Sequence, residues 1–297
     1  MTKVVSLINL KGGVGKTSTT IQLAECLSLE HNKKVLVVDL DPQTNATISL
    51  IDEEDWLKLD KNNQTLFNLF NDKLNRTNDF DINKAIQRRV SNLSINNLDL
   101  LPSSLRFIEI QDRLSDIPNQ TYYMENPMEV LKNAISKHLA NYDFVLIDCP
   151  PNLGFVTKNG MEISDYYFIP TIPDTLSTYG IPQIIKTISE YSSKRNLKIK
   201  CLGLVITKYV SISSAHKRGK ETLPARFKNI FEELKIEPAP VFKTFIPQAN
   251  KLAEAVDLTE TPRSFKQKYG TSKSGDRYIY EYIFELTEEF LKYVGWR

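Results

Sequence analysis

The sequence has few cysteines and no long apolar segment. Its 297 residues include three cysteines, Cys26, Cys149 and Cys201, and no two of them have the C-x-x-C spacing of metal or redox sites. Neither a disulfide framework nor a cysteine-bound metal is indicated, and a reducing compartment fits best. No run approaches the roughly 20 apolar residues that a membrane-spanning helix needs, and the apolar start is too short for a signal peptide. We expect a soluble, cytoplasmic protein.

The net charge is small, but its distribution is uneven. The chain carries +2 overall, with −4 in residues 1–150 and +6 in residues 151–297. From Lys186 to Lys228 there are eleven basic and two acidic residues. A run of like charge is normally a solvated surface. The alternative is a surface that binds the phosphates of a nucleic acid.

A glycine-rich stretch follows the first apolar run, residues 4–8. It reads Lys11-Gly12-Gly13-Val14-Gly15-Lys16-Thr17 and precedes a helical pattern that begins near Ser18. Glycines let backbone N–H groups turn inward around an anion at the positive end of the next helix. In such a loop Lys16 reaches the phosphates, and Thr17 is placed to ligate Mg²⁺. The stretch therefore predicts a phosphate-binding loop.

Acidic residues follow two later apolar runs. Asp39 and Asp41 come after residues 35–38, and Asp148 ends the run 142–147. The carboxyl ends of parallel strands are where α/β sheets bind ligands. An isolated D-x-D is usually a turn, but behind a phosphate loop it indicates a role in the site. For Cys149, beside Asp148, we expect a buried structural thiol.

Three motifs together resemble the ParA/MinD family of ATPases. Leu10 occupies the position of the first glycine of an ordinary Walker A motif, and Lys11 is an additional lysine, which is the deviant K-G-G-V-G-K-T pattern of that family. Residues 39–47 and 148–154 are similar to its second and third motifs. The resemblance implies that Lys11 crosses a dimer interface to the partner's nucleotide, while Lys16 acts within its own subunit.

The resemblance also implies cofactors and residue roles. Asp41 would position the attacking water, making it catalytic with Lys11 and Lys16, while Asp39 and Asp148 would support the Mg²⁺ that Thr17 ligates. ATP would be bound by a set drawn from the loop and from two later strand ends, which in the family lie beside the adenine base: Lys11, Gly12, Gly13, Val14, Gly15, Lys16, Thr17, Ser18, Lys208, Pro247 and Asn250.

Partners follow from the same resemblance and from the basic run. We expect an ATP-dependent homodimer that binds nucleoid DNA without sequence preference and is stimulated by a ParB-like or other adaptor. Its cargo would be a plasmid, a chromosome origin or a protein assembly. With ten residues before the loop, we expect no N-terminal helix-turn-helix module. The expected DNA contacts are Lys186, Lys194, Arg195, Lys208, Lys217, Arg218 and Lys220.

Two other functions stay open on the same scaffold. A MinD-like membrane-cycling ATPase needs a basic amphipathic C-terminal helix, whereas residues 281–297 hold four glutamates against Lys292 and Arg297. A metabolic or electron-transfer enzyme, such as a nitrogenase iron protein or a ligase-type synthetase, would need a further constellation, and none is visible. We therefore expect no membrane partner.

Strand and helix patterns alternate along the chain. This alternation predicts an α/β fold, a doubly wound and mainly parallel sheet flanked by helices, in a single P-loop domain over residues 1–297. Residues 52–126 read as a possible insertion, with short helices expected at 66–70, 82–90 and 105–116. A final amphipathic helix is expected at 277–294.

Overall fold

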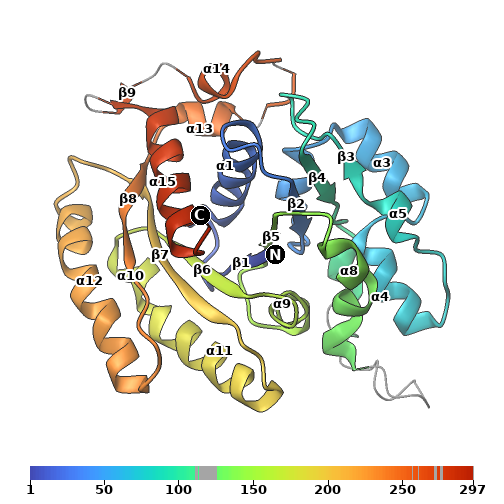
Figure 1. The fold of residues 1–297 in the computed structure, drawn as a ribbon, viewed down its shortest axis with the longest axis horizontal. Helices are drawn as coiled ribbons and strands as arrows, with labels where there is room; N and C mark the ends of the chain where they lie inside the picture. The colour runs from blue at the N-terminus through green and yellow to red at the C-terminus, as the bar shows by residue number, and fades with distance from the viewer. Residues whose placement is uncertain are drawn as a thin grey trace.

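Eight strands form the central sheet (Figure 1). The computed structural model describes residues 1–110, 113, 126–255, 257–259, 261–270, 273–274 and 277–296. Across the sheet the order is β3-β4-β2-β5-β1-β6-β7-β8, and every neighbouring pair is parallel except β3 with β4. The strands are β1 (Lys3–Leu7), β2 (Val35–Asp39), β3 (Gln87–Arg88), β4 (Leu98–Leu101), β5 (Phe144–Asp148), β6 (Tyr166–Thr171), β7 (Lys200–Tyr209) and β8 (Val241–Pro247).

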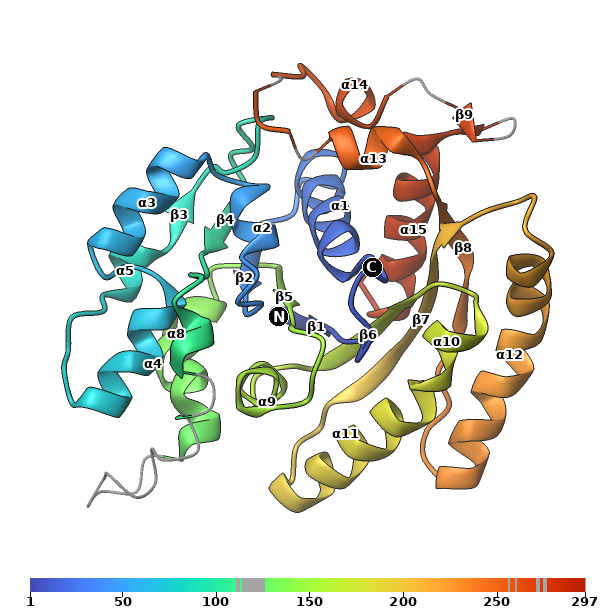
Figure 2. The same cartoon turned by 180° about the vertical axis from the view of Figure 1, so that it is seen from behind.

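Helices cover both faces of this sheet, because its strands are apolar on both sides (Figure 2). Alternate residues of β1 point to opposite faces, so Val4 joins one hydrophobic cluster and Val5 the other. The Val5 cluster includes side chains of α1 (Lys16–Leu29), α2 (Asn45–Ile48), α14 (Phe265–Tyr269) and α15 (Ile279–Tyr293). The Val4 cluster includes side chains of α4 (Leu66–Asn75), α5 (Ile82–Ala85), α6 (Phe107–Ile110), α8 (Val130–Leu139), α9 (Phe155–Met161), α11 (Ile181–Arg195) and α12 (Ser214–Leu234). The predicted doubly wound, mainly parallel fold is confirmed.

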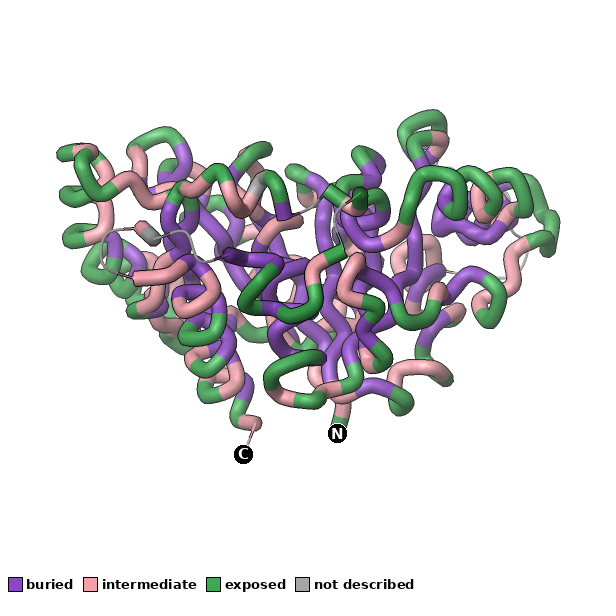
Figure 3. Tube along the Cα trace, turned by 90° about the horizontal axis from the view of Figure 1, so that it is seen from above, coloured by how far each residue is buried: buried purple, intermediate pink, exposed green. Residues whose placement is uncertain are grey.

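The phosphate-loop motif and the acidic motifs meet at one edge of the sheet. Leu7 of β1 and Asp39 of β2 both pair in register with Asp148 of β5, which lies between them. Seen from above, the residues of these central strands are buried, and exposed residues lie mainly on the outer helices and loops (Figure 3). The carboxyl ends of the middle strands therefore bring sequence-distant motifs together, as the position of ligand sites in open α/β sheets requires.

Residues 52–110 add helices and two strands to the layered structure. Four consecutive acidic residues, 52–55, cap and begin α3 (Glu53–Lys61), and α4 extends the helix expected at 66–70. The prediction of one helix over 82–90 is wrong, because α5 ends at Ala85 and residues 87–88 form the antiparallel edge strand β3. Residues 111–116 of the helix expected at 105–116 lie outside the described residues, except 113. That 52–126 is an insertion stays a prediction.

Shorter elements complete the chain. They are the 3₁₀ turn η2 (Pro127–Glu129), α10 (Thr175–Tyr179), α13 (Asn250–Glu254) and the antiparallel pair β9 (Lys273–Ser274) and β10 (Arg277–Tyr278). The expected C-terminal helix is confirmed as α15, with apolar residues such as Ile283 and Phe290 fully buried. Among the described residues, no helix combines the length and apolarity needed to cross a membrane.

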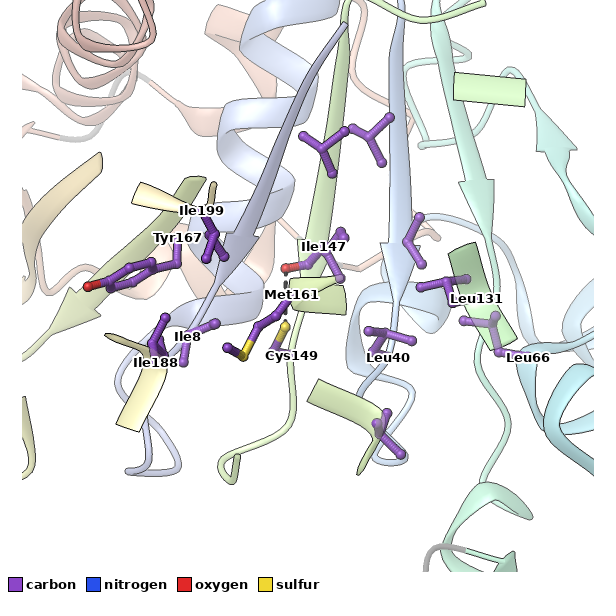
Figure 4. Close-up of a cluster of buried hydrophobic side chains, with 14 of the residues drawn as sticks. Ile8, Leu40, Leu66, Leu131, Ile147, Cys149, Met161, Tyr167, Ile188 and Ile199 are labelled. Carbon is purple, nitrogen blue, oxygen red and sulfur yellow. Dashed lines mark hydrogen bonds between the residues drawn. The ribbon is translucent and has the colours of Figure 1, made fainter. Parts of the chain in front are cut away.

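Cys149 lies in the Val4 cluster, directly behind the strand end that carries Asp148. Its Sγ lies 3.9 Å from the Ile147 carbonyl oxygen, and Figure 4 shows it beside Met161, between Ile8 and Leu40. Burial raises the pKa of the thiol, so it stays protonated and unreactive. The expectation of a buried structural cysteine is confirmed.

A buried ion pair ties the C-terminal segment to α1. Lys268 Nζ lies 2.6 Å from Glu25 Oε1, and the two side chains are 2% and 0% exposed. Tyr269 donates its hydroxyl to Glu25 Oε2 at 2.7 Å, and Ser91 also donates to Glu25. Paired in this way, the two charges tolerate a dry environment that neither could occupy alone.

Lys268→Met leaves the Glu25 carboxylate buried without its cation. We expect the free energy of unfolding to fall by about 3–5 kcal/mol, since breaking one partner of a buried pair costs that much. Urea denaturation monitored by circular dichroism measures this loss. The control is Lys58→Met, which removes an exposed lysine that pairs with Asp55 and should leave stability nearly unchanged, because the pair is screened by solvent. Equal effects of the two substitutions would contradict the assigned role of the buried pair.

Candidate nucleotide site

The glycine-rich loop leaves β1 and enters α1 through two residues in the left-handed region. Gly13 has φ 75° and Gly15 has φ 86°, conformations that favour glycine. Asn9, just before the loop, accepts the backbone N–H of Lys11 at 3.0 Å and donates to the Pro170 carbonyl at 2.8 Å. The loop is thus tied to β6 as well as to β1.

Thr207, on β7, ties the loop to a third strand. Its hydroxyl lies 2.6 Å from the Val14 carbonyl and 3.1 Å from the Thr171 carbonyl, and the residue is 2% exposed. One hydroxyl carries one proton, so it donates to one of these two oxygens at a time. Thr207 therefore holds the phosphate loop against the carboxyl ends of β6 and β7.

Lys16 points back over the loop rather than into solvent. Its Nζ donates to the Asn9 carbonyl at 3.2 Å and to the Lys11 carbonyl at 3.4 Å, and the residue is 6% exposed. Burial lowers the pKa of this ammonium, while the carboxylates of Asp148 and Asp41 act against that shift. A cation held here by neutral carbonyls is available to an incoming anion.

Asp148 lies beside Thr17 and fits the requirements of a magnesium shell. Thr17 donates its hydroxyl to Asp148 Oδ2 at 2.6 Å, whereas Asp148 Oδ1 is buried and has no hydrogen-bond partner in the part of the chain that the structure describes. Burial raises the pKa of Asp148 to about 7, the Thr17 hydrogen bond acting against it. Among the described residues no three His, Cys, Asp or Glu side chains are grouped to hold a metal alone. This suits Mg²⁺, which keeps waters and takes oxygens from a nucleotide.

Asp39 and Asp41 differ in what surrounds them. Asp39 is fully buried and accepts three hydrogen bonds from protein groups: the Asp41 N–H at 3.1 Å, the Thr47 N–H at 2.8 Å and the Thr47 hydroxyl at 2.7 Å. Burial and the nearby Asp148 raise its pKa. Asp41 accepts the Gln43 N–H at 2.9 Å and is 6% exposed. Asp39 therefore organises the loop that carries Asp41, and its implied metal role stays a prediction.

Lys11 reaches away from Lys16. Its Nζ donates to Ser177 Oγ at 2.8 Å and lies 3.7 Å from Asp174 Oδ1, and its side chain is 39% exposed. Asp174 caps α10 by accepting the Ser177 N–H at 2.6 Å. Lys11 is thus held at the surface of its own subunit by two polar groups that it would have to leave to act elsewhere.

The three residues expected beside the base line one cavity. Lys208, Pro247 and Asn250 share a cavity of about 260 Å³ with Gly15 and Ser18 from the start of α1. Lys208 has φ 49°, so β7 turns sharply at its end. The predicted phosphate and base residues are therefore brought together, although Gly15 and Asn250 lie 235 residues apart in the chain.

The expected DNA contacts divide into two groups. Lys208, Lys217 and Arg218 are exposed near the carboxyl edge of the sheet, and Lys220 lies half-buried with its Nζ 3.9 Å from the centre of the Phe245 ring. Lys186 and Lys194 are exposed on α11, which carries Lys194 about 20 Å from its start. Arg195 bonds to Glu162 at 2.8 Å and to Glu129 at 2.9 Å. Its charge is therefore already paired within the subunit.

The basic helix α12 lies directly on the loop that precedes α10. A Cβ added at Gly219 would come 1.9 Å from the Pro173 carbonyl oxygen. Only glycine allows the two backbones to approach so closely. Because Asp174 follows Pro173, α12 rests against the segment that holds Lys11.

Comparison with known proteins identifies the family. A family model described as an AAA domain matches residues 2–201. The chain belongs to this AAA-domain family. The ParA/MinD resemblance is confirmed by the sporulation initiation inhibitor protein Soj of Bacillus subtilis. Soj is 28% identical over 255 residues, which cover 86% of this chain and 88% of Soj.

Two solved structures have a similar fold. Cobyrinic acid a,c-diamide synthase from Mycobacterium smegmatis, solved with bound ADP and magnesium, is 27% identical with a TM-score of 0.67, over 87% of this chain and 92% of that one. A putative plasmid partition protein from Borrelia burgdorferi bound to AMPPNP also has a TM-score of 0.67. It covers 99% of this chain and 98% of its own at 22% identity, which shows the fold alone.

Three groups of the site were not singled out from the sequence. Asn9 breaks the first apolar run, which is a weak signal for a polar brace. Asp174 and Ser177 have the spacing of a helix N-cap, but nothing local indicates that they hold Lys11. Thr207 and Gln22 carry no local signal, because a polar residue at a strand end or in a helix is common.

Thr207→Val removes the hydroxyl that supports the phosphate loop while keeping the side-chain shape. We expect the affinity for ADP to fall about tenfold, since a lost hydrogen bond that leaves a buried carbonyl unpaired costs about 1–3 kcal/mol. Isothermal titration calorimetry measures the change. The control is Thr222→Val on α12, whose exposed hydroxyl bonds only to carbonyls of its own helix. Unchanged ADP affinity in Thr207→Val would show that the loop keeps its position without this hydroxyl.

Proposed function

We propose that this chain is a ParA-like ATPase that dimerises on ATP, binds DNA without sequence preference and positions or segregates a cargo through adaptor-stimulated hydrolysis. The observation that carries the proposal is the pair of lysines in one loop. Lys16 is buried over the loop, while Lys11 reaches outward to Ser177 and Asp174. Two cations from one loop are thus presented to two different places.

Exposed apolar side chains near Lys11 support a dimer. Leu176 and Tyr179 of α10 are 78% and 82% exposed, and Ile212, just before α12, is 90% exposed. Exposed apolar side chains gathered around a site favour association with another surface. A second copy that covers them would receive Lys11 at its own nucleotide once the contacts with Asp174 and Ser177 are released.

The proposed ATPase site assigns one task to each group. The loop N–H groups and Lys16 would hold the phosphates of ATP, and Thr17, with Asp148 next to it, would hold Mg²⁺. Bound Mg²⁺ would neutralise charge on the transferring phosphate. Asp41 orients the attacking water, and Asp39 keeps the Asp41 loop in place. Hydrolysis is slow in this arrangement because Lys11 must arrive from the partner and an adaptor must improve the geometry.

Lys11→Ala and Lys16→Ala should fail at different steps. Lys16→Ala removes the cation over the loop, so ATP binding itself should fall more than tenfold. Lys11→Ala should bind ATP within about threefold of wild type but lose the rise in turnover per subunit with protein concentration. Titration calorimetry and steady-state phosphate release measure the two effects, with Lys58→Ala as an exposed control. Wild-type turnover per subunit that does not depend on protein concentration would contradict the dimer mechanism.

The DNA surface that we propose is the start of α12 together with the end of β7. Lys208, Lys217 and Arg218 are exposed there, close to the nucleotide site. Lys186 and Lys194 on α11 extend the positive surface along the neighbouring helix, and α11 and α12 run side by side (Figure 2). Arg195 is not part of the proposed DNA surface, because its charge is paired with Glu129 and Glu162. Lys220 is part of it and is held in place by its contact with the Phe245 ring. Such a surface makes phosphate contacts, which give salt-sensitive binding without sequence preference.

Co-sedimentation with a non-specific duplex tests this surface. Wild type should bind with ATP but not with ADP or without nucleotide, and binding should weaken steeply as salt rises. Lys217→Glu with Arg218→Glu should lower the affinity at least tenfold and reduce the salt dependence. The matched control reverses two lysines on α3, Lys58→Glu with Lys61→Glu. No binding by wild type under any condition would overturn the DNA part of the proposal.

A membrane-cycling function has less support. The apolar side of α15 packs against the sheet, with Ile279, Ile283, Leu286 and Phe290 fully buried. Those side chains are not available to insert into a bilayer unless the core opens. Co-sedimentation with anionic liposomes and ATP is the test that would restore this alternative.

A second candidate is an ATP-dependent synthase of small molecules. It is favoured by one observation, the 27% identity to the diamide synthase crystallised with ADP and magnesium. The two functions share the phosphate loop and differ in what stimulates turnover. ATP hydrolysis that rises with an amide donor and a small carboxylic acid, and not with DNA, would favour the synthase.

A further inference from the structure

The cavity lined by Lys208, Pro247 and Asn250, called the base cavity below, contains a polar side chain with an unused hydrogen-bonding atom. Gln22, on α1, lines the cavity of about 260 Å³ together with Pro247 and Asn250. The residue is 3% exposed, and its Oε1 is buried without a hydrogen-bond partner among the described residues. A buried amide oxygen without a donor costs free energy. A hydrogen bond from a ligand in the cavity would remove that cost.

The position of Gln22 on α1 relates it to the phosphate loop. Ser18 and Gln22 are four residues apart, so they share one helix face, and both line the cavity. Gly15, at the start of the helix, closes the end of the cavity nearest the phosphate loop. A nucleotide with its phosphates on the loop would therefore extend along this face with its base toward Gln22.

The terminal amide of Gln22 can turn toward a ligand with little strain. The torsion about the bond to a terminal amide is broad, so a partial turn can bring Oε1 toward the cavity. Nothing in the described residues holds Oε1 where it is. The side chain can thus offer an acceptor to the cavity while its aliphatic part stays packed against the helix.

We propose that Gln22 is a specificity residue that selects adenine by accepting a hydrogen bond from the 6-amino group of the base. This inference rests on the proposed function, because it takes the ligand to be an adenine nucleotide. Adenine carries an amino donor at position 6, whereas guanine carries a carbonyl acceptor there. An acceptor on Gln22 would pair with the first and oppose the second. A buried polar group left unpaired by the wrong ligand is the strongest source of such discrimination.

A pair of ligands that differ only in the 6-amino group isolates this contact. ADP and purine riboside diphosphate have the same sugar and phosphates, and neither is hydrolysed during a titration. Wild type should bind ADP about tenfold more tightly than purine riboside diphosphate, which corresponds to about 1.4 kcal/mol. Gln22→Met keeps the length of the side chain and removes the amide. It should therefore bind ADP less tightly than wild type does, and it should bind ADP and purine riboside diphosphate with equal affinity. Pyrophosphate, which lacks a base, should bind wild type and Gln22→Met equally.

Gln64→Met is the matched control, because Gln64 is also a buried glutamine and lies beside α3, away from the base cavity. It should keep the tenfold preference for ADP. The thermal midpoint of Gln22→Met without ligand should equal or exceed that of wild type, because the substitution removes an unpartnered buried oxygen. A merely structural glutamine would instead lower the midpoint and leave the ligand preference unchanged.

Two results would overturn the inference and leave the proposed function standing. One is equal affinity of wild type for ADP and purine riboside diphosphate, a measurement that needs no variant to fold. The other is an unchanged tenfold preference in Gln22→Met. Failure of wild type to bind ADP and pyrophosphate would overturn the proposed function itself.

Discussion

An excess of buried negative charge at one edge of the sheet governs the site. Asp39, Asp41 and Asp148 are each at most 6% exposed, and Lys16 is the cation buried with them. Donors from its own loop surround Asp39, while burial raises the pKa of Asp148 and leaves one of its oxygens without a partner among the described residues. An added divalent cation would relieve the remaining repulsion. The same parallel register that creates the crowding also places the phosphate loop next to it.

Tight backbone anchoring matches this charge arrangement. The loop is braced by Asn9 toward β6 and by Thr207 toward β7, so its N–H groups are oriented before any ligand arrives. Preorganised donors of this kind stabilise developing charge without paying for reorganisation at the moment of reaction. Lys11 is the exception, because it makes polar contacts at the surface that are separate from the rest of the site. The site is therefore rigid toward its own nucleotide and adjustable toward a partner.

Much of the fold and of the site could be predicted from the sequence, because the informative residues are contiguous. The loop, the D-x-D turn and the end of β5 each combine an apolar strand with the polar residues that follow it, so the register of parallel strands brings them together. Contacts between distant segments could not be predicted. Lys11 and Ser177 are 166 residues apart, and Lys268 and Glu25 are 243 apart. The edge strand β3 could not be predicted because two residues are too few to show a period. The ion pairs of Arg195 could not be predicted because Glu129 and Glu162 lie on other segments.

The contact between Gly219 and Pro173 couples the proposed DNA surface on α12 to the segment that holds Lys11. If release of Lys11 shifts the loop at Asp174, α12 must move with the loop or lose its packing, since the backbones touch without an intervening side chain. Occupancy of one surface then changes the affinity of the other by a common factor, whichever ligand arrives first. DNA bound to α12 would by the same reciprocity favour the conformation in which Lys11 is free. Under the proposed function, nucleotide state and DNA occupancy would then be two measures of a single conformational equilibrium.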